Sequence, residues 1–276
     1  MTSSELKTTI ISSKKFLNRF LYSTIKTKGG ENGELELCDC LLEFKNAYIV
    51  LQIKEKDSES NASFDDWFDR KVLKKAKNQI KSSIEQLENR DFSFFSKESG
   101  KGMEVFVDRT KERKYIIIFD SDNTPDNYLK FYITKENISI NFFSLMDFEK
   151  MLDNIVLPAD IFDFLDFRMK YYRNAKDFDR KLIIEELSTN VTILGRIISD
   201  IQVSDLFILK KYIELGLDVE SVGKFNYIMQ EVEKNAPENC KTLLELMSFN
   251  RRDAIQYVKL WDIAFEKAKG NEFYLP

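Results

Sequence analysis

The sequence predicts an α/β (α+β) protein in which a mixed sheet with flanking helices is followed by an all-helical C-terminal region. Strand-like runs occur between residues 34 and 143, and one of them, 115–119, is apolar throughout, as is typical of a buried central strand. Beyond these runs only helical periodicity remains. This change of pattern predicts two domains, residues 1–155 and residues 156–276, each long enough to form its own core.

The N-terminal part is predicted to form a helix followed by a β-hairpin. Apolar side chains recur at roughly helical spacing over residues 5–28, and Gly29-Gly30 is a typical helix end. The expected apolar face of this helix consists of Leu6, Ile10, Phe16, Phe20 and Tyr22. Residues 34–44 and 47–55 have the pattern of strands, and only Lys45-Asn46 separates them. We therefore expect a hairpin closed by a two-residue turn.

A long helix is predicted after the hairpin, over residues 65–90. Its expected apolar face is Trp67, Leu73, Ala76, Ile80, Ile84 and Leu87, at the spacing of a helix packed on a sheet. Further strands are expected at 103–107, 115–120, 129–133 and 138–143. The C-terminal helices are expected at 147–153, 158–173, 177–200, 204–215, 219–235, 238–248 and 250–268. The hairpin therefore belongs to the sheet of the first domain and lies next to the long helix.

The chain contains no histidine, which excludes Ser-His-Asp triads, Cys-His dyads and histidine-based metalloproteases and nucleases. Neither a phosphate-binding P-loop nor a dinucleotide-binding glycine fingerprint is present. The three cysteines lack the paired spacing of zinc ligands and are interpreted as small buried hydrophobic side chains. Catalysis would therefore depend on carboxylates, lysines, tyrosines or a hard metal ion bound through oxygen.

The predicted hairpin gathers three polar side chains on one face. With a turn at Lys45-Asn46, Asp39 lies opposite Gln52, and Lys54 follows two residues later on the same face. Asp39 offers a carboxylate, and Gln52 and the backbone carbonyl of Ile53 offer neutral oxygens, to Mg²⁺ or Mn²⁺. Lys54 has the chemistry to orient an attacking water and to stabilise charge on a phosphate. An exposed polar strand face is the alternative, but the mostly apolar surroundings predict burial.

This pattern, Asp39…Gln52-Ile53-Lys54, resembles the D…(D/E/Q)-x-K core of the PD-(D/E)XK nuclease superfamily. The spacing of 13 residues from Asp39 to Gln52 and the order helix, strand, strand, helix agree with its restriction-endonuclease-like core. The glutamine resembles the Q-x-K pattern of the Mrr-like branch. Family members often take a further carboxylate from the first helix, which implies Glu5, the one acidic residue between positions 1 and 28. The resemblance covers roughly residues 1–145.

The long helix carries a run of cations opposite its apolar face. Six cations occur within twelve residues: Arg70, Lys71, Lys74, Lys75, Lys77 and Lys81. They are interpreted either as a solvated helix face or as a ridge that contacts nucleic-acid phosphates. Lys75 and Gln79 also resemble positions at which related nucleases place auxiliary residues. By contrast, the run Asp120-Ser121-Asp122-Asn123 is predicted to be a turn rather than a metal site.

The sequence thus predicts a Mg²⁺-dependent endonuclease that acts in restriction or phage defence. DNA is favoured over RNA as its substrate. A nuclease-like module that binds nucleic acid or protein, with cleavage weak or lost, is the first alternative. In a second alternative, the helical residues 156–276 form the functional half of the protein and act as a protein-interaction module. A homodimer or a protein partner at this helical region is also an open expectation. No apolar run is long enough for a membrane span and no signal peptide is evident, so a cytoplasmic protein is expected.

Overall fold

A computed structural model of the 276-residue chain provides the three-dimensional description. The structure describes residues 2–16, 20–27, 35–89, 93–96, 103–106, 108–125, 128–155, 157–174, 203, 207, 218–235 and 240–269. Among these residues, none of the helices combines the length and the apolar character that crossing a bilayer requires. The helices predicted at 177–200 and 204–215 fall almost entirely outside the described residues.

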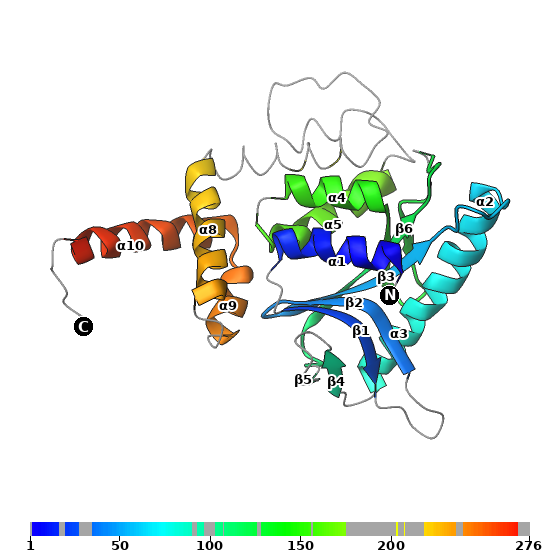
Figure 1. Ribbon diagram of the computed structural model, residues 1–276, viewed down its shortest axis with the longest axis horizontal. Helices are drawn as coiled ribbons and strands as arrows, with labels where there is room; N and C mark the ends of the chain where they lie inside the picture. The colour runs from blue at the N-terminus through cyan, green and yellow to red at the C-terminus, as the bar shows by residue number, and fades with distance from the viewer. Residues whose placement is uncertain are drawn as a thin grey trace, which may run out of the picture.

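One mixed sheet forms the centre of the fold (Figure 1). Its strands are β1 (Leu21–Thr27), β2 (Leu35–Glu43), β3 (Ala47–Glu55), β4 (Ser93–Ser96), β5 (Met103–Phe106), β6 (Glu112–Asp120), β7 (Phe131–Ile133) and β8 (Ser139–Ser144). Within the described ranges their order is β5-β4-β1-β2-β3-β6-β8-β7. The β3–β6 and β6–β8 pairs are parallel, and the other neighbours are antiparallel. The predicted α/β class with a mixed sheet is therefore confirmed.

The apolar run predicted to be a central strand is the core of β6. Its residues 115–119 are buried, and β6 lies between β3 and β8 in the sheet. Crossover connections put helices on both faces of such parallel strands, which explains why both faces of β6 are apolar. The hairpin strands are also close to prediction, because β2 and β3 cover residues 35–43 and 47–55.

The N-terminal helix is shorter than predicted, and it turns a different face to the core. Helix α1 covers Ser3–Lys15, and residues 21–27 form β1 rather than further turns of helix. Leu6 and Ile10 were expected in the core, but they are 46% and 49% exposed. Hydroxyl side chains form the buried face instead: Ser4, Thr8 and Ser12. Their small size lets α1 approach β3 and α4 closely, with which it is in contact.

The long helix after the hairpin is continuous over residues 64–89, but its first half is wider than an ordinary α-helix. It begins as α2 (Phe64–Trp67), continues as a π-helix (η2, Phe68–Ala76) and ends as α3 (Lys77–Asn89). Phe68, Val72, Ala76 and Ile80 are buried at a constant spacing of four residues. The wider π turn brings these four residues onto one face of the helix. Leu73, which was expected on that face, is only partly buried and lies at the margin of this core.

The sheet separates two apolar cores. The long helix covers one face, over Leu41, Val50 and Ile117. Helices α1, α4 (Leu145–Asn154) and α5 (Asp160–Asn174) cover the other face, over Ile49 and Leu51 (Figure 1). The second core extends without a break across residue 155 into α5 and the C-terminal helices. The division at residues 155 and 156 therefore stays a prediction, and α5 packs as part of the sheet's helical layer.

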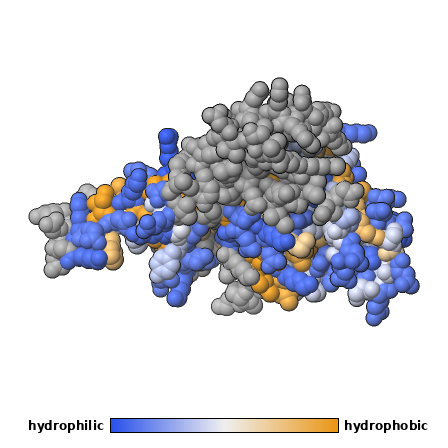
Figure 2. Space-filling view, turned by 90° about the horizontal axis from the view of Figure 1, so that it is seen from above, coloured by the Kyte–Doolittle hydropathy of each residue, from blue (hydrophilic) through white to orange (hydrophobic). Residues whose placement is uncertain are grey.

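The C-terminal helices are α8 (Val219–Asn235), α9 (Cys240–Met247) and α10 (Arg251–Lys269). The second half of α10 carries large apolar side chains that are 41–57% exposed: Leu260, Trp261, Ile263 and Phe265. Figure 2 shows apolar residues gathered at this projecting end of the molecule. The predicted all-helical character of the C-terminal region agrees with the residues that the structure describes.

Candidate active site

The hairpin has the register predicted from its two-residue turn. The paired residues are Glu43–Tyr48, Leu42–Ile49, Leu41–Val50 and Cys40–Leu51. Since side chains alternate along a strand, Asp39, Gln52 and Lys54 share a face with Leu41 and Val50. This is the face that the long helix covers.

At Asp39 a side chain replaces the backbone ladder between the two strands. The Ile53 N–H donates a hydrogen bond of 2.5 Å to the Oδ2 atom of Asp39. The ladder between β2 and β3 ends one position earlier, at Cys40 and Leu51, whereas β2 remains paired with β1 and β3 with β6. Each strand therefore keeps a neighbour on its outer side, while the side chain of Asp39 lies between them. Asp39 thus interrupts the backbone pairing of two strands in the middle of a buried sheet.

Lys54 completes a compact polar cluster with Asp39 and Ile53. Its Nζ atom lies 2.8 Å from the carbonyl oxygen of Ile53 and 3.5 Å from Asp39 Oδ2. The side chains of Lys54 and Asp39 are only 14% and 5% exposed. An ion pair shielded from water in this way is screened much less by salt than a surface pair is. The structure thus brings together three of the predicted residues through direct contacts.

Gln52 lies beside this cluster and carries an unsatisfied polar atom. Its side chain is 1% exposed, and its Oε1 atom has no hydrogen-bond partner among the residues that the structure describes. A buried acceptor left without a partner costs roughly 1–3 kcal/mol. Such an atom is explained if a ligand or a bound ion satisfies it. A carboxamide oxygen is a hard, neutral ligand of the kind that Mg²⁺ and Mn²⁺ accept.

A second buried carboxamide oxygen lies on the long helix. Gln79 Oε1 is also buried, without a partner within the described part of the chain. One turn later, the Ser83 hydroxyl donates to the carbonyl of Leu37, which places this part of α3 over the strand that carries Asp39. Gln79 was expected here only from a resemblance, and Ser83 was not predicted. The sequence feature that could have identified Ser83 is its polar side chain next to the apolar positions Ile80 and Ile84.

Glu5 lies at the same end of the sheet but has a local structural role. Its carboxylate accepts a hydrogen bond of 2.8 Å from the Thr2 backbone, and the Thr2 hydroxyl accepts one from the Glu5 backbone, which forms a capping box. The neighbouring Ser4 N–H donates to Glu55, the last residue of β3. However, α1 packs on the opposite face of the sheet from Asp39 and Lys54. Glu5 as a further metal ligand therefore stays a prediction.

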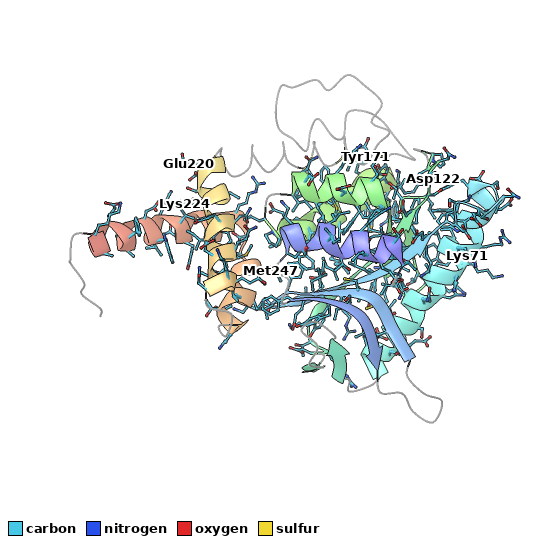
Figure 3. All side chains as sticks on the ribbon, viewed as in Figure 1. Lys71, Asp122, Tyr171, Glu220, Lys224 and Met247 are labelled. Carbon is cyan, nitrogen blue, oxygen red and sulfur yellow. The ribbon has the colours of Figure 1, made fainter. Side chains whose placement is uncertain are left out.

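The predicted cationic ridge lies mainly on the exposed side of the long helix. Five of its members are exposed: Arg70, Lys71, Lys74, Lys75 and Lys81. Lys77 differs because it is partly buried, with its Nζ 4.1 Å from the centre of the Tyr132 ring. Figure 3 labels Lys71 on this helix and Asp122 beyond the end of β6, in the same part of the molecule. The residues after Asp120 form a turn, as predicted.

The turn end of the hairpin is held firmly by other elements. Ser248, just after α9, accepts a hydrogen bond from the Lys45 backbone N–H, and Lys45 Nζ lies 3.1 Å from Glu245. On the sheet side, burial raises the pKa of Tyr48 to about 12, so its hydroxyl stays neutral and accepts a bond from the Asp108 N–H. Both contacts restrain the strands that position the site residues.

The donor set is compatible with a divalent cation, although it is poor in charge. The candidate donors on the hairpin are the Asp39 carboxylate, the Gln52 carboxamide oxygen and the Ile53 carbonyl, and the long helix carries the Gln79 carboxamide oxygen. Within the described ranges, no group of three or more His, Cys, Asp or Glu side chains is arranged to hold a metal ion. A cation bound here would therefore depend on neutral oxygens and water for most of its ligands, as Mg²⁺ often does.

A scan against protein-family models finds no match, and a search of curated proteins finds no relative. Among solved structures, the chain is similar to the small subunit of the heterodimeric restriction endonuclease R.BspD6I. The sequence identity is 12% and the TM-score 0.28, over 75% of this chain and 87% of that subunit.

Proposed function

We propose that this chain is a metal-dependent nuclease that hydrolyses phosphodiester bonds, with DNA as its substrate. The single observation that carries the proposal is the buried Gln52 carboxamide oxygen, which has no partner among the described residues and lies beside the Asp39 and Lys54 pair. Burying a polar cluster of this composition in the middle of a sheet costs stability. A functional role explains why the chain retains it.

The proposed roles follow from the chemistry of each group. Asp39, Gln52 and the Ile53 carbonyl would hold Mg²⁺ or Mn²⁺, and Gln79 on the long helix would offer a further carboxamide oxygen. A bound divalent ion supplies Lewis acidity toward the phosphate and lowers the pKa of a coordinated water. The Lys54 ammonium is suited to orient the attacking water and to stabilise the charge that develops on phosphate oxygens. The exposed cations of the long helix offer contacts to the nucleic-acid backbone.

Plasmid cleavage in Mg²⁺ or Mn²⁺ tests this proposal. Lys54→Ala and Asp39→Asn should each abolish metal-dependent cleavage, because each removes a group with a direct role in the reaction. Asp65→Asn is a matched control, since Asp65 is an exposed carboxylate at the start of α2. Unchanged cleavage by both site variants, in proteins that remain folded, would rule out this site.

The second candidate function is a nuclease-like module that binds nucleic acid or protein without efficient cleavage. It is favoured by the low charge of the donor set, since the Glu5 carboxylate is engaged in the helix cap. Titration calorimetry with Mn²⁺, with and without DNA, distinguishes the two functions. Absence of metal binding by the wild-type protein under both conditions would support the binding module.

A further inference from the structure

We propose that the Lys54 ammonium occupies the cation position of the site and that a divalent ion binds only by displacing it. The proposal rests on the proposed function, because it concerns the same ligands. Lys54 Nζ contacts two of the oxygens assigned to the metal, the Ile53 carbonyl at 2.8 Å and Asp39 Oδ2 at 3.5 Å. The lysine thus acts as an internal, covalently tethered counter-ion.

Repulsion between like charges disfavours the binding of both cations at these two oxygens. Magnesium binds oxygen at about 2.1 Å and requires near-octahedral geometry. An ammonium group held against the same two oxygens would lie within a few ångströms of the metal, in surroundings where like charges repel strongly. The N–H of Ile53 also donates to Asp39 Oδ2, which limits how far that oxygen can move to accommodate both cations.

The surroundings make the tethered cation stable in the absence of metal. Asp39 is a buried carboxylate, and an uncompensated buried charge is costly. Lys54 neutralises this charge, and its side chain is 14% exposed, so it is not sealed in the interior. Displacement would release the ammonium toward solvent, from which a phosphate or an attacking water would approach. Metal entry and lysine release are then one exchange, and the lysine becomes available only in the loaded site.

Metal affinity, measured by calorimetry with Mn²⁺ on the full-length chain without DNA, tests the proposal. Lys54→Met keeps the length and apolar stem of the side chain but removes the ammonium. This variant should bind Mn²⁺ at least about tenfold more tightly than wild type, because no cation has to leave. Lys54→Arg keeps a competing cation and should bind no more tightly than wild type.

Lys56→Met is the matched control for a general change in charge. Lys56 lies two residues further along, and its Nζ contacts the Ser60 carbonyl rather than the site. Its Mn²⁺ affinity should stay within about twofold of wild type, since charges outside direct contact are weakened by solvent and salt. Thermal unfolding of each variant verifies that the compared proteins are folded.

The outcomes separate this proposal from the proposed function. Equal or weaker Mn²⁺ binding by Lys54→Met than by wild type overturns the displacement idea, while metal-dependent cleavage by wild type would still support the nuclease. An equal gain in Lys56→Met also overturns it, because the effect would then be general electrostatics. If neither wild type nor Lys54→Met binds Mn²⁺, both the displacement idea and the assigned metal site fail.

Discussion

Asp160, the first residue of α5, and Arg251, the first residue of α10, form a buried ion pair with an Nε–Oδ2 distance of 3.3 Å. Both side chains are only 4% exposed. The pair therefore joins the helix layer on the sheet to the C-terminal helices at a position from which water is largely excluded. Both residues belong to the region predicted to be a separate domain. The contribution of this ion pair to stability therefore shows how strongly the C-terminal helices depend on their packing against α5.

Replacing Arg251 should destabilise the whole fold. Arg251→Met leaves the Asp160 carboxylate buried without this partner, which costs about 3–5 kcal/mol. Urea denaturation measures this decrease in stability. The exposed pair Lys224 and Asp262 provides the control, and Lys224→Met should cost less than about 1 kcal/mol. A similarly small effect of Arg251→Met would show that the C-terminal helices do not depend on this ion pair.

Gln52→Met should stabilise the protein while impairing metal binding. The substitution replaces a buried amide, whose Oε1 atom has no partner among the described residues, by an apolar side chain of similar length, which should increase the free energy of unfolding by about 1 kcal/mol. It also removes a proposed ligand, so Mn²⁺ affinity should fall. Denaturation and calorimetry on the same sample measure the two effects.

Gln86→Met is the control for this prediction. Gln86, on the long helix rather than the hairpin, is likewise buried with an Oε1 atom that has no partner among the described residues. Gln86 lies about two turns beyond Gln79, toward the C-terminal end of α3. Mn²⁺ binding by Gln86→Met should therefore be the same as that of wild type. A wild-type Mn²⁺ affinity in Gln52→Met would contradict the role assigned to the carboxamide.

The cationic ridge should determine the salt dependence of DNA binding. Removing one lysine that touches a phosphate lowers the slope of log K against log salt concentration by about 1. Lys71→Gln and Lys74→Gln should each weaken binding at low salt and reduce this slope, as measured by fluorescence anisotropy. Lys267→Gln, an exposed lysine on α10, is the control. Equal slopes for all three variants and wild type would indicate that the ridge is an ordinary solvated helix face.

Because α1 buries its hydroxyl side chains, substitutions at Ile10 and Thr8 should differ strongly in their effect on stability. Ile10→Lys should change stability by less than about 0.5 kcal/mol, because Ile10 is 49% exposed. Thr8→Leu should destabilise by about 1–3 kcal/mol, because Thr8 is fully buried where α1 closely approaches its neighbours. Thermal or chemical unfolding distinguishes the two. The reverse order of sensitivity would mean that Ile10, and not Thr8, faces the core.

The hairpin register was predictable from the sequence because it depends on local geometry. A two-residue turn at Lys45-Asn46 determines which residues face each other, and the period of two assigns Asp39, Gln52 and Lys54 to one face. The apolar strand at 115–119 was predictable for a related reason, since a continuous apolar run has no solvent-facing side. Local pattern alone therefore determined the strands of the site and the residues that they carry.

Other features depended on neighbours that are distant in the sequence. Leu6 and Ile10 are spaced as a helical core face, yet tertiary packing buries Ser4, Thr8 and Ser12 instead. Residues 21–27 fit a helical pattern but form a strand, because β2 and β4 provide partners on both sides. Periodicity predicts that a face exists, whereas the surrounding elements decide which face is buried.

The sequence by itself determined which residues share the hairpin face, because turn length and strand period are properties of the local chain. Only the tertiary structure decided how these residues interact. It brings the Lys54 ammonium against Asp39 and Ile53 and leaves the carboxamide oxygens of Gln52 and Gln79 buried without a partner among the described residues. Such contacts arise when the long helix packs over the strands and excludes water, and no local pattern specifies that packing.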